Sequence, residues 1–336
     1  MRKNKLEILK AGDVSMPELL DEGDFDRQMT EIVEPYLEGL RRTGRVSPKL
    51  DLYYELYPRT PNKGTIVICH GFTESTEKYH ELIYYFLKNG YQAAIYDQRG
   101  HGQSFRETED RGLIHVRHFS RYVSDLHVFV HKIVMKKMAV DEKHLYLYGH
   151  SMGGCVSARY LEVYPDDFAG AVLNAPMLGL NLGKYSVRSA EAICAYKILT
   201  GHGMERIFNQ RPFDPDERFE NCSASSEARF RYYHQVRLRH PEYQTGGASY
   251  YWGQEAIWTG QQAVKKKEVR KIRTPLLMFM AGQETLVDES AQKRFLRHLT
   301  CGAGILVPDS RHEIYRAQNP VLGVYLNRIY EFFGMS

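Results

Sequence analysis

The chain has 336 residues, of which 43% are hydrophobic and 26% are charged, and its formal net charge is +4. This length is too short for three ordinary domains, so we expect one large domain with an insertion and a sizeable core. No apolar run approaches the length of a membrane span, and the mildly basic charge gives no ground for nucleic-acid binding.

The five cysteines are scattered along the chain and form no C-x-x-C pair. This spacing indicates free thiols in a reducing compartment and no zinc site. The first 15 residues are basic, but no apolar stretch follows them, so they do not form a secretory signal. We therefore expect a cytoplasmic protein that at most contacts the inner face of a membrane peripherally.

The first element expected in the chain is an amphipathic helix. Apolar residues recur at helical spacing from Phe25 to Leu40, and Pro35 lies within this pattern, where it can kink the helix. Residues 50–57 alternate between apolar and polar side chains, which predicts a half-exposed antiparallel strand. We assign residues 1–45 to an N-terminal helical extension.

Short apolar strands then alternate with amphipathic helices. The expected strands are residues 65–69, 93–96, 145–148, 169–175, 275–281 and 304–307. The expected helices lie near residues 79–89, 119–138, 151–164, 289–299 and 319–333. Strands that are apolar on both faces, with helices between them, indicate a parallel sheet covered on both sides and thus an α/β fold. We assign this core to residues 46–176 and 272–336 and expect its active site at the carboxyl ends of the strands.

Residues 177–271 interrupt the alternation of strands and helices. This segment is helical in pattern, poor in strands and rich in aromatic residues, and it contains both tryptophans, Trp252 and Trp258. We predict that it forms a helical cap inserted over the active edge of the sheet. Most of its aromatic side chains are expected to pack the small core of the cap itself.

A short motif marks the predicted nucleophile. Gly149-His150-Ser151-Met152-Gly153 matches the pattern G-x-S-x-G, and it lies between an apolar strand and an amphipathic helix, as a nucleophile elbow requires. The serine of so tight a turn adopts a strained backbone conformation, and bulk two residues before or after it would clash. The motif predicts that the Ser151 hydroxyl stands above the sheet.

Two backbone N–H groups are the predicted donors to an oxyanion. The N–H of Met152, at the start of the helix, faces any oxyanion that forms beside the serine. A second donor is expected from the loop after another strand, and His70-Gly71-Phe72 follows the strand at 65–69. Gly71 permits close approach of the backbone, so the Phe72 N–H is the predicted donor. His70 is expected to hold the turn by hydrogen bonds.

A serine hydroxyl needs a general base of near-neutral pKa, which is most often a histidine. The chain has 14 histidines, so position must choose among them. His312 follows the last expected strand and precedes the C-terminal helix, where the base occurs in this order of elements. His101 lies in a glycine-rich turn, and His150 flanks the serine and should point away from it. We therefore assign the base to His312.

With these motifs in place, the chain resembles the α/β-hydrolase superfamily, and within it the lysophospholipase and monoacylglycerol lipase branch, which is grouped with serine aminopeptidase-like hydrolases. The matching segments are "IVICHGFTESTEKYHEL", "YDQRGHGQS", "YGHSMGGCVSARYLEVYPDDFAGAVLNAPMLGL", "RPFDPDERFEN", "GGASYYW" and "SRHEIYRAQNP". The insertion segments resemble those of bacterial lysophospholipases. The resemblance implies a Ser–acid–His triad, the two backbone oxyanion donors and a helical cap over an acyl-binding pocket, with no metal or organic cofactor.

The resemblance also implies where the triad acid lies, in the turn after the penultimate core strand. Glu284 occupies this position, where Asp is commoner, and glutamate is chemically competent in the role. Asp288 is the alternative, although it precedes a helical pattern and suits an N-cap. Glu289 falls in the first turn of that helix, where negative charge suits the helix dipole. We favour Glu284 over Asp288.

These expectations lead to a serine carboxylic-ester hydrolase that cleaves lysophospholipids or monoacylglycerols through an acyl-serine intermediate. The alternatives are a general esterase or serine peptidase on the same scaffold, and a catalytically silent binding protein. Basic residues within 229–239 and 265–273 suggest attraction to anionic lipid head groups or a membrane surface. The competing interpretation of these residues is a solvated, salt-bridged helix face.

Overall fold

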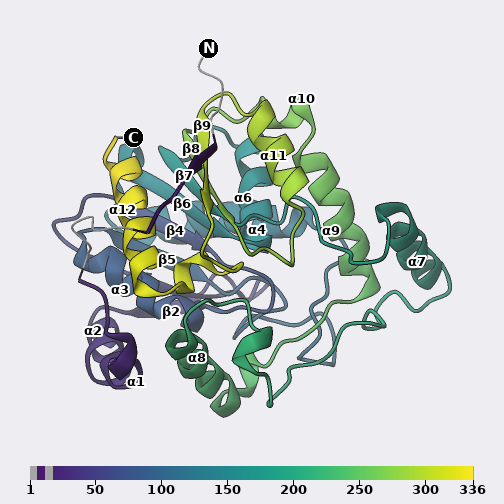
Figure 1. Cartoon of the computed structure of the whole chain (residues 1–336), viewed down its shortest axis with the longest axis horizontal. Coiled ribbons are helices and arrows are strands. Elements are labelled where there is room, and N and C mark those ends of the chain that lie inside the picture. The colour runs from purple at the N-terminus through teal and green to yellow at the C-terminus, as the bar shows by residue number, and fades with distance from the viewer. Residues whose placement is uncertain (1–5, 12–17, 336) are drawn as a thin grey trace.

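A nine-stranded sheet lies at the centre of the computed structural model, which describes residues 6–11 and 18–335 (Figure 1). The strands are β1 (Leu6–Ile8), β2 (Arg42–Arg45), β3 (Tyr53–Tyr57), β4 (Thr65–Cys69), β5 (Gln92–Tyr96), β6 (Leu145–His150), β7 (Gly170–Asn174), β8 (Leu276–Ala281) and β9 (Gly302–Val307). Their order in the sheet is β1-β9-β8-β7-β6-β4-β5-β3-β2. The pairs that involve β2 and β3 are antiparallel, and all other pairs of this sheet are parallel. The predicted α/β architecture and the antiparallel strand near residue 53 are therefore confirmed. The expected half-exposure of that strand is wrong, because β3 is almost wholly buried between two layers.

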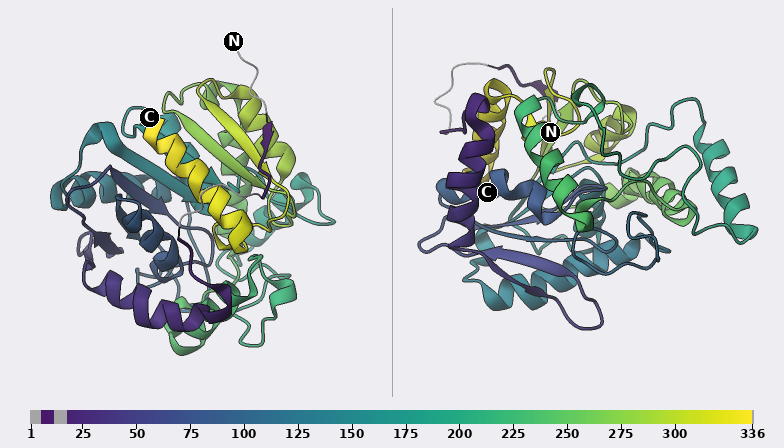
Figure 2. Two further views of the ribbon diagram at one scale, coloured as in Figure 1. Left: turned by 60° about the vertical axis from the view of Figure 1, so that its left-hand side comes forward. Right: turned by 90° about the horizontal axis from the view of Figure 1, so that it is seen from below.

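Helices cover both faces of the sheet. They are α1 (Phe25–Gln28), α2 (Glu34–Glu38), α3 (His80–Lys88), α4 (Ser120–Phe129), α5 (Met135–Lys137), α6 (Met152–Val163), α7 (Val187–Leu199), α8 (Glu227–Arg239), α9 (Tyr250–Ala263), α10 (Lys266–Val269), α11 (Glu289–His298) and α12 (Asn319–Met335). The apolar side chains of α4, α6 and α11 pack on one face, and those of α3 and α12 pack on the other. Figure 2 shows α12 lying across its face of the sheet.

The central strand β6 illustrates why both faces must be covered. All six of its residues are buried. Leu147 belongs to the cluster under α4 and α6, whereas Tyr146 and Tyr148 belong to the cluster under α3 and α12. Because successive strand residues point to opposite faces, an almost wholly apolar strand is stable only between two apolar layers. Each side chain buried in this way contributes about 1.5–3 kcal/mol.

The first 45 residues contain more than the predicted helical extension. The helix is present as α1, a π-helical turn over Met29–Val33 and then α2. Pro35 follows that turn, and because proline lacks an N–H and clashes with the preceding turn, a local widening relieves the mismatch. The segment also supplies β1 and β2, the two edge strands of the sheet. The expectation about a secretory signal falls mostly on residues outside the described part of the chain.

The insertion carries the helices α7, α8, α9 and α10, as the helical pattern predicts. Helix α9 packs against both α7 and α6, while α8 packs against α1. In Figure 1, α7 stands out from the rest of the molecule on the side away from the N-terminal helix. Across the described residues, no helix is both long enough and apolar enough to cross a membrane.

Candidate active site

Ser151 lies at a strained turn between β6 and α6. Its backbone has φ 51° and ψ −116°, a conformation that costs a non-glycine residue about 1–3 kcal/mol. A side chain on Gly153 would overlap the carbonyl oxygens of Cys69 and His70, so the turn can close only with glycine there. The Ser151 N–H donates to the Asn174 carbonyl oxygen at 3.0 Å, which holds the strained residue against β7. The tight turn that the motif predicts is therefore present.

Glu284 and His312 meet at the carboxyl ends of β8 and β9. The Glu284 Oε2 atom lies 2.6 Å from His312 Nδ1, and both side chains are buried. Its other oxygen accepts the N–H groups of Leu286 at 2.7 Å and Val287 at 3.3 Å. Burial opposes ionisation, but the hydrogen bond and charge of His312, together with these two N–H groups, lower the pKa of Glu284 below its usual value. The carboxylate is thus charged and fixed in position beside the imidazole.

The two other carboxylates of this segment have structural partners. Asp288 is the N-cap of α11, and its Oδ1 atom accepts the Ser290 N–H at 2.8 Å. Glu289 forms an ion pair with Lys293 one turn along the same helix. Of the three acids in this segment, Glu284 is therefore the one that the structure brings to His312.

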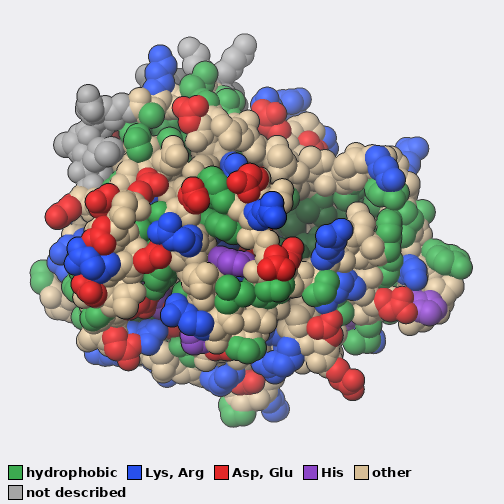
Figure 3. Space-filling view, turned by 60° about the horizontal axis from the view of Figure 1, so that its bottom comes forward, with side chains coloured by type: hydrophobic (Ala, Val, Ile, Leu, Met, Phe, Trp, Pro, Cys, Tyr) green, Lys and Arg blue, Asp and Glu red, His purple; other side chains and the backbone are tan. Residues whose placement is uncertain are grey.

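A cavity of about 470 Å³ opens above Ser151, a size within the range of about 300–1,000 Å³ typical of small-molecule sites. Ser151, His312 and Phe72 contribute to its wall on the side of the sheet. Most of the remaining wall is apolar and comes from the insertion. These side chains include Leu180, Leu182, Tyr185, Ile193, Ile207, Phe208, Tyr250, Trp252 and Ile257. Figure 3 shows a hollow with hydrophobic side chains in its depth.

The backbone around the serine offers two free donors. Over the residues that the structure describes, neither the Phe72 N–H nor the Met152 N–H donates to a protein acceptor. Phe72 lines the cavity, and Met152 directly follows Ser151 at the start of α6. Buried N–H groups normally have partners, so two unpaired donors at such a position are suited to a negatively charged oxygen of a ligand. The Phe72 ring packs on the Trp252 ring, with centroids 4.5 Å apart.

A buried ion network, which the sequence did not predict, borders the cavity, since Glu74 and Glu313 both contribute to the cavity wall. Glu74 accepts the Gly71 N–H at 2.5 Å, the Lys78 Nζ at 2.9 Å and the hydroxyl of Tyr315 at 2.9 Å. Lys78 also bonds Glu313, the residue after His312, at 2.7 Å. The network therefore links the loop of the free Phe72 donor to the loop of His312.

Charge pairing keeps this network ionised. Burial opposes ionisation of Glu313, but Lys78 and Arg316 lower its pKa to about 2. Burial also opposes ionisation of Glu74, whose pKa is nevertheless held well below its usual value by Lys78 and His150. In the sequence, the only hint is that Glu74 and Lys78 lie four residues apart in a helix-forming stretch just after the glycine of the loop.

The histidines that compete with His312 have other surroundings. His70 accepts the Gln98 N–H at 2.9 Å, and burial lowers its pKa to about 4, as befits a histidine that holds a turn. His101 is buried, with Nδ1 3.0 Å from the Arg99 carbonyl oxygen. His150 is 1% exposed, its Nδ1 lies 3.1 Å from the Asn174 carbonyl oxygen, and its ring centroid lies 4.9 Å from that of His312.

The basic residues of α8 are not all on the surface. Arg229 is 1% exposed and bonds Glu81 at 2.7 Å. Arg237 packs over the Phe213 ring at 4.2 Å and donates to backbone carbonyls. These two guanidinium groups are committed to the protein interior, so the interpretation of them as a surface for lipid head groups is wrong.

Comparison with known proteins gives the family and the fold of the chain. A sequence model of the family described as "Serine aminopeptidase, S33" matches residues 60–319. "Lysophospholipase L2" of Escherichia coli (strain K12) is 29% identical over 285 residues, which cover 80% of this chain and 79% of that protein. "Monoglyceride lipase" of Homo sapiens is 30% identical over 128 residues, 37% of this chain and 38% of that protein. Among solved structures, a soluble variant of monoglyceride lipase from Saccharomyces cerevisiae superposes with a TM-score of 0.67 at 17% identity, covering 88% of this chain and 94% of that chain.

Proposed function

Because the chain belongs to the serine aminopeptidase family of α/β-hydrolases, we propose that it is a serine carboxylic-ester hydrolase that cleaves the acyl ester of lysophospholipids or monoacylglycerols. The observation that carries the proposal is the juxtaposition of an apolar cavity, Ser151 at its strained turn and His312, which lies in the wall of that cavity and is paired with Glu284. The similarity to "Lysophospholipase L2" over 80% of the chain supports the lipid class of substrate.

In the proposed reaction, Ser151 Oγ attacks the acyl carbonyl carbon while His312 Nε2 accepts the serine proton. The carbonyl oxygen becomes an oxyanion and takes hydrogen bonds from the free N–H groups of Phe72 and Met152. His312 then donates its proton to the leaving glycerol oxygen, and the ester bond breaks. A water molecule, deprotonated by His312, releases the fatty acid from the acyl-serine in a second cycle of the same kind.

Glu284 has the role of the acid in this proposal. Its Oε2 atom accepts the Nδ1–H of His312, which leaves Nε2 free to face the serine. Since the carboxylate is charged, it also stabilises the imidazolium that forms during attack. The two backbone N–H groups on its other oxygen fix its direction, so the longer side chain of glutamate is held as firmly as that of an aspartate would be.

The cap supplies the wall for the acyl chain. An apolar cavity with a few polar groups at one end suits a substrate with one alkyl chain and a polar head. The division into a core of residues 46–176 and 272–336 and a cap of residues 177–271 is part of this proposal. All five cysteines are free thiols, which supports a cytoplasmic setting. Contact with the inner face of a membrane is a further part of the proposal, since lysolipids reside there.

The test is a panel of substrates with the wild-type chain and Ser151→Ala. The panel contains lysophosphatidylcholine, lysophosphatidylethanolamine, monoacylglycerols, short p-nitrophenyl esters and aminoacyl amides. We expect turnover of the long-chain esters, and labelling of wild type but not Ser151→Ala by a fluorophosphonate probe. Turnover of short esters or amides alone would contradict the lipid proposal and leave the serine mechanism standing. An unlabelled wild-type protein would contradict the mechanism itself.

A further inference from the structure

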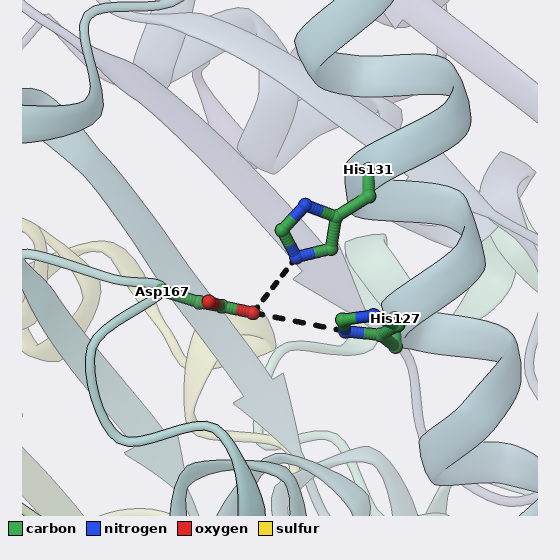
Figure 4. A group of neighbouring side chains, drawn as sticks. All are labelled: His127, His131 and Asp167. Carbon is green, nitrogen blue, oxygen red and sulfur yellow. Dashed lines mark hydrogen bonds and ion pairs between the residues drawn. The ribbon is translucent and has the colours of Figure 1, made fainter.

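A second group of chemically active side chains lies apart from the cavity. His127 is on α4, His131 is on the π-helical turn Val130–Val134 that continues it, and Asp167 is in the turn between α6 and β7 (Figure 4). His131 Nε2 lies 2.9 Å from Asp167 Oδ2, and His127 Nδ1 lies 3.7 Å from the same atom. One ligand atom from each residue lies within 4.8 Å of the other two. None of the three lines the cavity above Ser151.

The helix presents both imidazoles on the same side. Residues four apart are neighbours on a helix surface, and the two ring centroids are 4.3 Å apart. The His127 ring also stacks on Tyr164, with centroids 4.1 Å apart and planes at 15°. Because the rings are already held in place, they need little rearrangement to direct a nitrogen at one common ion. Less conformational entropy is then lost when the ion binds.

The carboxylate in this group lacks a permanently charged partner. Within the described chain, the ion pairs of Asp167 are with His127 and His131, and no lysine or arginine joins them. The neighbouring Asp166, in contrast, pairs with Arg273. The Tyr160 hydroxyl donates to Asp167 Oδ2, as groups behind a metal ligand commonly do.

We propose that His127, His131 and Asp167 form a binding site for one divalent transition-metal ion of the Zn²⁺ class. Two imidazoles and a carboxylate are ligands that Zn²⁺ prefers, and water completes the tetrahedron. The side chains are 35%, 34% and 23% exposed, so an ion and its water can enter from solvent. The ion ties α4 to the turn after α6, at the end of α6 opposite to Ser151. We assign it a stabilising role that is independent of ester hydrolysis.

The test is calorimetric titration of Zn²⁺ into the full-length chain, free of any affinity tag and stripped with a chelator. We expect one ion per chain with a Kd of about 1 µM or below, and a rise in Tm of a few degrees. His131→Gln and Asp167→Asn should each weaken binding by roughly tenfold or more. His144→Ala is the matched control, because His144 forms a similar 2.8 Å contact with Asp141 without a second histidine, and it should bind as wild type does.

Two results would overturn the proposal. One is the absence of micromolar Zn²⁺ binding by the wild-type chain. The other is equal binding by wild type, His131→Gln and Asp167→Asn, which would place the ion elsewhere, such as on the half-buried thiols of Cys222 and Cys301. Circular dichroism of the stripped variants checks that they are folded. Ester hydrolysis should be the same with and without Zn²⁺, so failure of this proposal and failure of the proposed enzymatic function are distinguishable.

Discussion

The residues below Ser151 and the residues above it differ in how they are held. Below it, Glu74, Lys78 and Glu313 are almost fully buried, and each makes at least two charge-assisted contacts. Above it, α7 buries only Cys194 and leaves Leu199 86% exposed to solvent. The buried ion pairs below Ser151 therefore fix their side chains in position, whereas α7 is held by few buried side chains.

This contrast predicts two kinds of variant. Changes below the serine should lower kcat for every substrate, because they disturb groups that act in the transition state. Changes in the cap should alter which acyl chain is preferred and leave the chemical step intact.

The largest effect is expected at the acid. Glu284→Gln should lower kcat by roughly 10³–10⁴-fold, because an amide can hold His312 in the wrong tautomer and cannot stabilise its imidazolium form. Asp288→Asn should change kcat less than about threefold, since asparagine is an equally good N-cap. Steady-state kinetics with a p-nitrophenyl ester measures both. The reverse order of losses would move the acid to Asp288.

A smaller loss is expected in the ion network. Glu74→Gln weakens the acceptor for the Gly71 N–H and leaves Lys78 with one carboxylate partner, so kcat should fall by roughly 10–100-fold. Glu81→Gln is the matched control, because it breaks an equally buried pair with Arg229 away from the cavity.

Glu74→Gln and Glu81→Gln should each lower the free energy of unfolding by about 2–4 kcal/mol, because each leaves a buried cation, Lys78 or Arg229, less well paired. Urea unfolding measures this term separately from kcat. If Glu81→Gln lowered kcat as much as Glu74→Gln does, the network would have only a structural role.

A still smaller effect on rate is expected in the cap. Phe208 lines the cavity although its side chain is 60% exposed. Phe208→Ala should lower kcat/KM by about tenfold for long-chain esters and by less than about twofold for p-nitrophenyl acetate. Trp258→Ala, which removes another half-exposed cap aromatic that does not line the cavity, should change neither. Equal losses on both esters would show that the cap also positions the reacting groups.

The smallest effect on the chemical step is expected from the buried histidines, which act on stability. Burial lowers the pKa of His70 and His150 to about 4, from an ordinary 6.5. Between these values the unfolded chain binds protons that the folded chain does not, so stability falls as the pH falls from about 6.5 to about 4. The free energy of unfolding should drop by about 2 kcal/mol per histidine between pH 7.5 and pH 5. Urea unfolding at several pH values measures the slope, and His70→Gln should make it smaller than in the wild-type chain; an unchanged slope in this variant would contradict the assignment.

Local sequence patterns were enough to predict the strands of the core and the turn around Ser151. The turn at Ser151 depends on two glycines and a strand-to-helix change, which are visible over a dozen residues. The position of His312 follows from the order of elements, because it lies after the last strand of the core, whereas Glu284 was chosen on the family resemblance. The structure brings those two side chains together.

Contacts between distant parts of the chain could not be predicted in this way. Lys78 and Glu313 are 235 positions apart, and a charged residue in an amphipathic pattern is normally expected to face solvent. Arg229 was expected at the surface. It is buried instead because it pairs with Glu81, which comes from another helix. His127 and Asp167 likewise meet only once α4 and α6 have packed side by side.

The two edges of the sheet carry a consequence for synthesis on the ribosome. β2 finds its partner β3 within a few residues, but β1 pairs with residues 304–306 of β9. At about 5–20 residues per second, β1 waits roughly 15–60 s for that partner to be translated. Until β9 has been synthesised, the backbone N–H and C=O groups of β1 have no partner strand. This pairing therefore joins the first and the last of the sheet's described strands to be synthesised, and it moves the edge of the sheet from β9 to β1.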